Sequence, residues 1–324
     1  MLTEDLQKEL VGQGYPVTHV RQFTTKNTGD RHYSDGHTSP DIPDNIIVEK
    51  LGPITTIGIN RPNKRNCVNK QTAEQLSKAI RDFEDDKSVY AGVLHGKGGN
   101  FCAGFDLEEL AERDEKFNLE FNVKEGEGLM GPTKRFIKKP LVAAISGYAV
   151  AGGLELALLC DLRVVEETAI MGVFNRHFGV PLMDGGTVRL QSMVGLSRAL
   201  DLILTGRAIK AKEAYEWGLA NRVVACGTAL GQAINLANSF VKFPQVCLQA
   251  DRTSTYHTAF SSCNIADALS FEWKNAKYVI QMVILNMGRK ELKLIRVRED
   301  QFGGKVRSLS CELELPLSIG LGAS

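Results

Sequence analysis

The stretch SGYAVAGGLELALLCDLRV, residues 146–164, decides the fold of this chain. It carries the chain from an apolar run (140–147) across a glycine-containing turn into an apolar helical segment (152–161), and then into a β-branched run (162–167). Strand, helix and strand at this spacing indicate a βαβ unit, the building block of layered α/β folds.

The same alternation precedes this unit. Short β-branched runs at 46–52, 54–60 and 90–96 predict strands, and the segment 69–86 predicts a helix between the last two. Apolar residues recur in that segment at intervals of three and four, so one face of the helix is apolar; they are Ala73, Leu76, Ile80 and Phe83.

After Gly185 the pattern becomes helical, and helical periodicity continues beyond about Pro244. We therefore expect four parts. They are a disordered or targeting extension (1–43), an α/β core (44–243), a helical carboxy-terminal region (244–288) and a tail without pattern (289–324).

Composition excludes several classes of protein. The chain has 39 basic and 38 acidic residues among 324 and no block of like charges, which argues against nucleic acid or an anionic membrane as the main partner. No apolar run approaches the roughly 20 residues needed to span a bilayer. The seven cysteines are scattered and include no CxxC pair, which fits reduced thiols in an intracellular protein better than a disulfide scaffold or a zinc site.

The amino terminus leaves two interpretations open. Residues 15–29 are basic, rich in hydroxyls and free of acids, as transit peptides are. Glu4, Asp5 and Glu9 precede them, and transit peptides avoid acids. The segment is therefore either a leader for the mitochondrial matrix or a plain disordered extension of a cytoplasmic protein.

Two glycine-containing turns (95–110 and 146–161) each end a strand and open a helix. A helix start presents unpaired backbone N–H groups, and two such groups from different loops can hold an oxyanion that develops during a reaction. The candidates are the N–H groups of Ala103 and Gly152. Alternatively, the glycines serve tight turns alone. Neither turn has the spacing of a P-loop or of a dinucleotide fingerprint.

Glu155 is a lone carboxylate in an otherwise apolar helix start. Desolvation there raises the pKa of a carboxylate and suits a general acid or base. The alternative role is a charge that complements the helix dipole.

Asp184 in VFNRHFGVPLMDGGT (173–187) has two possible roles, a catalytic group or the cap of a helix that starts at Gly185. Asp106 and Asp161 are predicted to cap the helix that begins at Leu107 and the turn into the run at 162–167. The six histidines form no ligand pattern, so no metal site is expected.

Four segments together resemble the crotonase family, the enoyl-CoA hydratase/isomerase superfamily. They are NRPNKRNCVN (60–69), FCAGFDL (101–107), SGYAVAGGLELALLCDLRV (146–164) and GGTVRL (185–190). The resemblance runs from about Ile46 to about Lys277, and it implies an α/β spiral of ββα repeats followed by a helical trimerisation region. It also implies an acyl-CoA substrate without a further cofactor, and a homotrimer or hexamer.

The resemblance assigns roles to individual residues. Ala103 and Gly152 match the two backbone N–H groups that polarise the thioester carbonyl, and Asp106 matches the aspartate of the first motif. The loop Lys64-Arg65-Asn66-Cys67 matches the segment that touches the nucleotide end and pantetheine of CoA, where a basic pair suits phosphates. The resemblance thus predicts that Lys64, Arg65, Cys67 and Asp106 bind CoA.

Hydratases of the family use two glutamates. The first matches Glu155, and the second falls at Asn175, which can orient water but cannot accept its proton. Asp184, counted back from the Gly-Thr of DGGT, is similar to an aspartate used by dienoyl-CoA isomerases and 3-hydroxyisobutyryl-CoA hydrolases.

The leading hypothesis is therefore an acyl-CoA enzyme of hydratase/isomerase type, in which Ala103 and Gly152 stabilise a thioester enolate while Glu155 and Asp184 move protons or hold water. Hydrolysis or decarboxylation on the same fold shares that intermediate. A non-catalytic acyl-CoA-binding protein is the alternative from another class.

Overall fold

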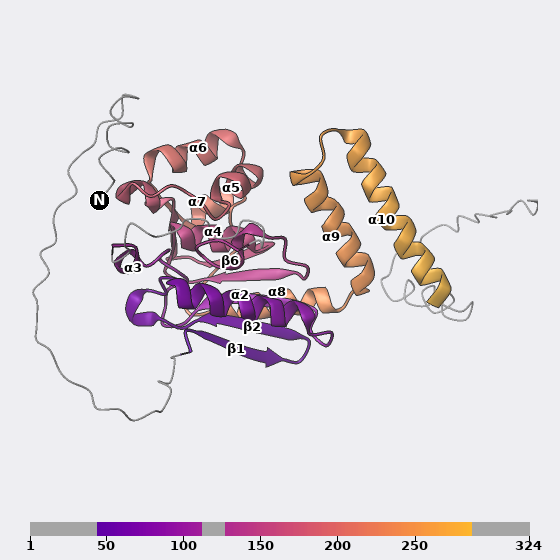
Figure 1. The fold of residues 1–324 in the computed structure, drawn as a ribbon, viewed down its shortest axis with the longest axis horizontal. Coiled ribbons are helices and arrows are strands. Elements are labelled where there is room, and N and C mark those ends of the chain that lie inside the picture. The colour runs from indigo at the N-terminus through magenta and orange to yellow at the C-terminus, as the bar shows by residue number, and fades with distance from the viewer. Residues whose placement is uncertain (1–43, 112–126, 287–324) are drawn as a thin grey trace, which may run out of the picture. The chain divides into compact units, whose positions relative to one another are not determined.

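The structure, a computed structural model, describes residues 44–111 and 127–286. Its main element is a sheet in the order β1-β2-β3-β4-β6-β9 (Figure 1). β1 pairs antiparallel with β2, and every other neighbouring pair in this sheet is parallel. The strands are β1 (Ile46–Leu51), β2 (Ile54–Ile59), β3 (Ala91–Gly96), β4 (Leu141–Ile145), β6 (Leu162–Glu166) and β9 (Arg222–Val224).

Helices cover both faces of this sheet. Val93 belongs to the apolar cluster that α8 (Ala229–Val241) completes, whereas its neighbour Leu94 belongs to the cluster that contains α2 (Lys70–Asp85) and α4 (Gly152–Leu159). Successive side chains of a strand point to opposite faces, so a strand with both faces covered reads as a continuous apolar run. The predicted strands and the predicted helices at 69–86 and 152–161 are therefore confirmed within one or two residues.

A second, smaller sheet was not predicted. It consists of β5 (Tyr148–Val150), β7 (Ile170–Gly172) and β8 (Ala208–Lys210), in that order. Each of these strands has three residues, too few to show a period of two in the sequence. Along the chain, β5 comes between β4 and α4. Because the smaller sheet holds β5 in place, it also fixes the turn that opens α4.

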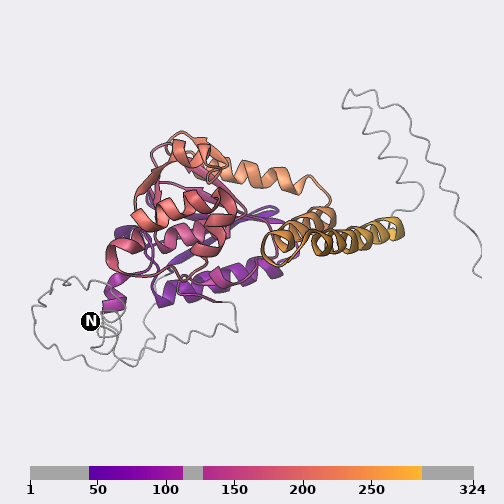
Figure 2. The ribbon, with the colours of Figure 1, turned by 90° about the horizontal axis from the view of Figure 1, so that it is seen from above.

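The helical second half has the elements that the pattern after Gly185 predicted. They are α5 (Gly186–Val194), α6 (Leu196–Thr205), α7 (Ala211–Glu216), α8, α9 (Gln245–Phe260) and α10 (Ile265–Asn286). α9 and α10 lie side by side in both views (Figures 1 and 2). Over the two described ranges, no helix combines the length and the apolar character that a bilayer crossing requires. The predicted extension (1–43) and tail (289–324) lie outside the described residues.

The prediction that Asp161 caps the turn into β6 is wrong. Its carboxylate accepts hydrogen bonds from the Leu141 amide (2.7 Å), from Arg252 Nε (2.7 Å) and from the Tyr256 hydroxyl (2.9 Å). The guanidinium of Arg252 also lies 4.7 Å from the ring centre of Phe136 and 5.0 Å from that of Tyr256. Because the ion pair is largely buried, Asp161 attaches α9 to the central sheet.

The loop after β2, the loop after β3 and strand β5 meet at the carboxyl edge of the parallel strands. Ligands bind at this edge in open α/β sheets. In the loop after β3, the Cys102 N–H donates a hydrogen bond to the Tyr148 carbonyl (2.9 Å). The Cys102 carbonyl accepts one from the Val150 N–H (3.1 Å). On its other side, Val68 N donates to Gly104 O (2.8 Å). The loop after β3 therefore lies between the loop after β2 and strand β5.

Candidate active site

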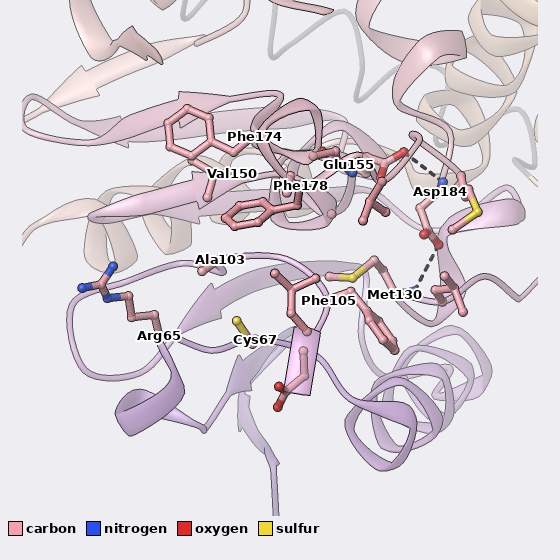
Figure 3. Close-up of a pocket in the computed structure, with 18 of the residues that line it drawn as sticks. Arg65, Cys67, Ala103, Phe105, Met130, Val150, Glu155, Phe174, Phe178 and Asp184 are labelled. Carbon is pink, nitrogen blue, oxygen red and sulfur yellow. Dashed lines mark hydrogen bonds between the residues drawn. The ribbon is translucent and has the colours of Figure 1, made fainter. Parts of the chain in front are cut away.

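A cavity of about 470 Å³ opens where these loops meet (Figure 3). One side consists of the loops after β2 and β3, and the other of the short helix η4 (Phe174–Phe178) and residues 180–184. Most of its wall is apolar, contributed by Phe105, Leu129, Met130, Val150, Phe174, Phe178, Val180 and Met183. Such a cavity excludes water from the few polar groups within it.

The structure brings the two glycine-containing turns into contact at this cavity. A methyl group placed on Gly104, whose φ is +103°, would lie 3.2 Å from the Gly152 nitrogen. Both predicted oxyanion residues, Ala103 and Gly152, line the cavity. Their amides differ: the Ala103 N–H donates to the Arg65 carbonyl (3.0 Å), whereas no group in the described ranges accepts the Gly152 N–H. Gly152 is the first residue of α4, so its amide has no partner within the helix.

Glu155 lies one helical turn further along α4, and its side chain is buried. Its Oε1 accepts hydrogen bonds from the Asp184 amide (2.9 Å) and from the Gly186 amide (2.8 Å). Both bonds end on the same oxygen, which leaves Oε2 for another partner. Glu155 thus supplies the acceptor for the start of α5 (Figure 3).

The environment of Glu155 favours its protonated form. Burial raises the pKa of this carboxyl group to about 7, and the charge of Asp184 adds to the rise. The two amides and the cation of Arg189 oppose it. A carboxyl group with such a pKa can both take up and release a proton near neutral pH. The prediction of a desolvated carboxylate at this position is confirmed.

Asp184 does not cap α5, and that interpretation is wrong. The residue before α5 is Gly185, and the Asp184 carboxylate points instead to residues 130–133. Its Oδ1 accepts from the Met130 amide (3.1 Å) and from the Thr133 hydroxyl. Burial raises the pKa of Asp184, although these two hydrogen bonds lower it. As in Glu155, one oxygen is occupied and the other is left for a ligand.

Arg189 holds the segment that carries Asp184 in place. Its Nη1 donates to the Asp184 carbonyl (3.0 Å) and its Nη2 to the Thr133 carbonyl (2.6 Å). This cation favours the ionised form of both Asp184 and Glu155. Together the two carboxylates and the guanidinium form a charged group behind an apolar wall.

Asn175 lies at the cavity on η4, where the family's hydratases carry their second glutamate. The residue is 8% exposed and lines the cavity. Its side-chain oxygen has no hydrogen-bond partner among the described residues. A buried amide oxygen without a donor is costly, so a ligand or water that donates a hydrogen bond would be stabilised there.

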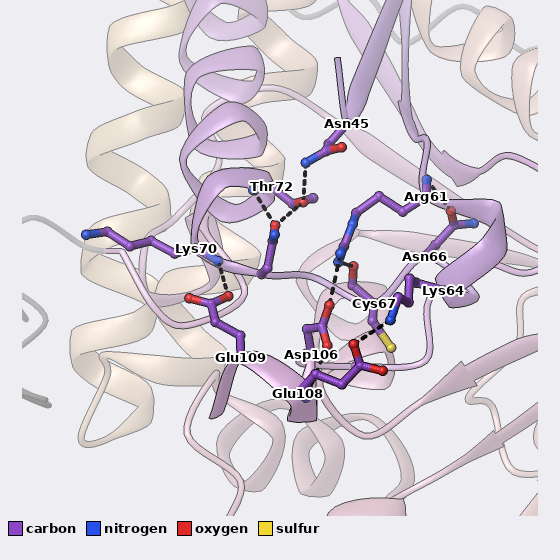
Figure 4. Close-up of polar contacts among 12 residues, drawn as sticks. Asn45, Arg61, Lys64, Asn66, Cys67, Lys70, Thr72, Asp106, Glu108 and Glu109 are labelled. Atoms are coloured by element: carbon purple, nitrogen blue, oxygen red, sulfur yellow. Dashed lines mark hydrogen bonds and ion pairs between the residues drawn. The ribbon is translucent and has the colours of Figure 1, made fainter. Parts of the chain in front are cut away.

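The four predicted CoA-contacting residues all line the cavity. The Lys64 ammonium is 2.5 Å from a carboxylate oxygen of Glu108 (Figure 4). The Arg65 guanidinium lies 5.4 Å from the ring centre of Tyr148. Burial raises the pKa of the Cys67 thiol. None of these contacts tests whether the four residues bind CoA, so their role in CoA binding stays a prediction.

Asp106 is the predicted helix cap. Its Oδ1 accepts from the Glu108 amide (3.3 Å) at the start of α3 (Leu107–Ala111), which confirms the cap. Its Oδ2 is 2.9 Å from Arg61 Nη2. Both oxygens are therefore engaged in holding α3 to the loop after β2 (Figure 4).

Three residues of the site were not singled out from the sequence, although Asn66 and Arg189 lie in segments that carry the resemblance. Thr133 and Arg189 act through contacts that join segments about fifty residues apart. Asn66 is completely buried, and its Nδ2 donates to the carbonyls of Lys97 (2.8 Å) and Asn100 (2.6 Å), which positions the turn after β3. Its φ of +57° lies in the left-handed region, which asparagine tolerates better than most residues. Over the described ranges, no group of three or more potential metal ligands is present.

Comparison with known proteins places this geometry in a family. The family model of the enoyl-CoA hydratase/isomerase family matches residues 49–293. The chain is 34% identical over 234 residues to a short-chain-enoyl-CoA hydratase of Clostridium acetobutylicum, covering 70% of this chain and 86% of that protein. It is 36% identical over 200 residues to a probable enoyl-CoA hydratase of Rhizobium meliloti, covering 61% and 76%.

Solved structures agree. The crystal structure of an enoyl-CoA hydratase from Mycobacterium tuberculosis is similar with a TM-score of 0.69 and 31% identity, covering 80% of this chain and 97% of that chain. The predicted crotonase-like α/β fold is therefore confirmed. The chain belongs to the enoyl-CoA hydratase/isomerase family and is an acyl-CoA enzyme of that type.

Proposed function

We propose that the cavity binds an acyl-CoA thioester and moves protons at the two carbons next to its carbonyl. The observation that carries this proposal is the pair Glu155 and Asp184. Each is buried with a raised pKa, each has one oxygen fixed by two donors, and the second oxygen of each has no hydrogen-bond partner among the described residues. Two such groups beside an open backbone N–H suit an enolate mechanism.

In the proposed reaction the Gly152 N–H binds the thioester oxygen. The Ala103 N–H joins it when the substrate oxygen replaces the Arg65 carbonyl as acceptor. For hydration, one carboxylate takes a proton from water as the water oxygen bonds to the β carbon. The electron pair of the double bond moves to the α carbon and thioester oxygen, and the other carboxyl group then gives its proton to the α carbon. The reverse is dehydration, and neither direction needs a cofactor.

Asn175 orients the water, which is one task of the second glutamate that hydratases carry at this position. Its amide oxygen accepts a hydrogen bond but cannot take the proton. We propose that Asp184 replaces the carboxylate at that step, because Asn175, Asp184 and Glu155 line one cavity. Lys64 and Arg65 are proposed to face the CoA phosphates at the mouth.

Loss of enoyl-thioester absorbance tests this proposal with crotonyl-CoA and longer 2-enoyl-CoA substrates, and gain of that absorbance tests it with 3-hydroxyacyl-CoA substrates. Glu155→Gln and Asp184→Asn are each expected to lower kcat at least about 100-fold, the range of a lost general acid or base. Binding of a saturated acyl-CoA should change little. Glu74→Gln, an exposed substitution on α2, is the matched control.

Two results would count against the proposal. One is full activity in both variants, and the other is no turnover by the intact protein on any member of the panel. Release of free CoA instead of a hydrated product would assign thioester hydrolysis to the same two carboxylates.

We also propose that copies of the chain associate through two apolar stripes. On α6 the exposed residues are Leu196, Leu200 and Leu204, and on α10 they are Ile265, Leu269 and Trp273. Each set is spaced by four residues, so it forms one stripe along its helix. Exposed stripes of this kind mark interaction surfaces. They support the expected homotrimer or dimer of trimers.

A further inference from the structure

A second cavity of about 680 Å³ lies between α9 and the core. Thr133 and residues 134–137 form one side, residues 182–189 form another, and side chains of α9 complete it. Met183 lines both this cavity and the active-site cavity, and the bonded pair Thr133 and Asp184 lies between them. The second cavity therefore begins directly behind a proposed catalytic carboxylate.

The polar lining of this cavity is basic. Among the described residues, five basic side chains and no acidic one line it: Lys134, Arg135, Arg189, Arg252 and His257. Carboxylates outside the lining pair with three of them, Glu84 with Arg135, Asp161 with Arg252 and Asp267 with His257. Lys134 and Arg189 have no salt-bridge partner in the described ranges, although both favour the ionised form of Asp184, so their positive charge is only partly balanced.

Arg252 is held ready to bind an anion. Its guanidinium packs beside the rings of Phe136 and Tyr256, whose own centres lie 5.0 Å apart, and only Nε has an acceptor, at Asp161. Within the described residues neither Nη1 nor Nη2 has one. Nη1 is closed to solvent, so Nη2 is the group left for a ligand. A guanidinium N–H gives a carboxylate oxygen a charge-assisted hydrogen bond. Packing against two rings lowers the entropy that binding must overcome.

The rest of the lining is apolar. It includes Phe136, Ile137, Leu159, Leu182, Phe260 and Phe271. A small inorganic anion would leave this surface uncovered, whereas a carboxylate on an apolar chain would match both kinds of wall.

We propose that this second cavity receives a carboxylate carried on an apolar chain. Its source is either the far end of an acyl group whose thioester occupies the active site, which rests on the function proposed above, or a separate carboxylic acid. In either case Arg189 links the two cavities, because it lines the second and donates to the carbonyls of Asp184 and Thr133 at the first.

Calorimetric titration of the full chain tests this with unreactive probes. They are hexanoyl-, octanoyl- and decanoyl-CoA, the same three thioesters with a carboxylate at the far end of the chain, and free octanoate. At one chain length or more, the carboxylated thioester is expected to bind at least about tenfold more tightly than its methyl-ended partner, which corresponds to about 1.4 kcal/mol. Octanoate that binds together with octanoyl-CoA identifies a separate acid, and octanoate that is displaced identifies the acyl end.

Two variants assign the effect to the cavity. Arg252→Met should remove the preference while leaving methyl-ended thioesters within about twofold of the intact protein. Because Arg252 also attaches α9, Lys134→Met serves as a second variant on an exposed side chain and should reduce the preference. Lys138→Met is the matched control, since Lys138 is exposed and lies outside the lining.

The proposal is overturned if the methyl-ended thioesters bind, their carboxylated partners gain nothing and octanoate does not bind. That outcome leaves the proposed function standing. If no thioester binds, the proposed function fails, whereas octanoate binding that Lys134→Met weakens still supports the second cavity.

Discussion

At the scale of single residues, Glu155 combines two tasks on separate oxygens. Oε1 accepts the amides of Asp184 and Gly186, and Oε2 is the oxygen that we propose faces the substrate. One mutation can therefore remove the proton-carrying group and keep the acceptor, and another can remove both. Glutamine retains an oxygen that can accept both amides, whereas alanine leaves two buried N–H groups without an acceptor.

The choice of substitution should thus separate activity from stability. Glu155→Ala is expected to lower the free energy of unfolding by about 1–3 kcal/mol for each amide left unpaired. Glu155→Gln is expected to lower it much less, although both variants lose activity. Chemical denaturation of the two variants and the intact protein measures the difference. Equal destabilisation by both would contradict the role assigned to Oε1.

The raised pKa of Glu155 also makes stability depend on pH. Between its ordinary value of 4.5 and about 7, the folded protein holds a proton that the unfolded chain has released. Stability from this group is therefore complete below about pH 4.5 and is lost as the pH rises through about 7, by an amount on the order of 3 kcal/mol. Glu155→Gln removes this loss. The melting temperature of the variant minus that of the intact protein should therefore be larger at about pH 8 than at about pH 5.

A melting-temperature difference that stays constant across this range would show that Glu155 does not titrate there. Asp184→Asn offers an independent check, because the charge of Asp184 contributes to the raised pKa of Glu155. In that variant the decline should end at a lower pH and be smaller in total.

Sequence could predict Glu155 as a desolvated carboxylate because its immediate neighbours along the helix are apolar. It could place Asp184 in the site only through the resemblance, and the capping interpretation failed because Glu155, 31 residues before Gly186, supplies the acceptor instead. Thr133 and Arg189 stayed invisible, because their importance depends on which distant backbone groups the fold places beside them.

At the scale of elements, the start of α4 packs tightly against the loop after β3. A methyl group on Gly153 would lie 2.1 Å from the Cys102 carbonyl oxygen, a backbone atom that cannot move aside. The close approach positions the Gly152 amide beside Ala103. Glycine at this position is thus required by the contact between two segments.

Gly153→Ala is accordingly expected to destabilise the fold by about 1–3 kcal/mol, the usual cost of overpacking, and to lower activity as the two turns separate. Gly231→Ala is the matched control. Gly231 lies in α8 with nothing within 4 Å of the added methyl group, so alanine should stabilise by up to about 1 kcal/mol. Thermal unfolding compares them, and an unchanged or raised melting temperature for Gly153→Ala would refute the close contact.

Element α3 is tied to the loop after β2 by three acids. Asp106 pairs with Arg61, Glu108 with Lys64, and Glu109 accepts the Lys70 amide (2.8 Å) (Figure 4). The ammonium of Lys64, a predicted phosphate contact, is therefore already paired. We therefore expect Glu108 to compete with the phosphates of CoA for this cation.

Glu108→Gln should consequently strengthen CoA binding by about two- to fivefold, the range of an exposed ion pair. The gain should shrink as salt is added, because salt screens the charge. Titration of CoA at two ionic strengths measures it, with Glu74→Gln as control. Weaker or unchanged binding would show that Lys64 does not face the phosphates.

Long elements could be read from the sequence and short ones could not. α2 and the strands of the central sheet have clear apolar patterns, whereas β5, β7 and β8 exist because of each other, through pairing that no local pattern records. The turn that opens α4 was located correctly, yet the strand that fixes it was missed.

At the scale of the whole molecule, the fold follows from the resemblance over residues 46–277 and is confirmed by the solved structures. The position of α9 could not be derived in the same way. It depends on Asp161, which reaches back to Leu141 in β4 and outward to Arg252 and Tyr256. The second cavity exists only because of that attachment, so no motif in the sequence announces it.

Association through the apolar stripes is tested at this scale. Leu204→Asp and Trp273→Asp place a charge on residues that are 70% and 68% exposed in the single chain. Each should shift the protein from a multiple of the 35.6 kDa chain toward the single chain, measured by light scattering after size exclusion. Val48→Asp, exposed on β1 outside both stripes, should leave the mass unchanged. An intact protein that runs as a single chain would refute the proposal.

The double use of Glu155 has a consequence for how such chains evolve. A lineage that abandoned the reaction would still be penalised for discarding this glutamate, because two buried amides at the next helix depend on it. The residue would then persist for its structural role alone, and its presence in a distant sequence would not show that the protein is an active enzyme. Asp184, which accepts one buried backbone amide rather than two, would be freer to drift and is the more informative marker of retained chemistry.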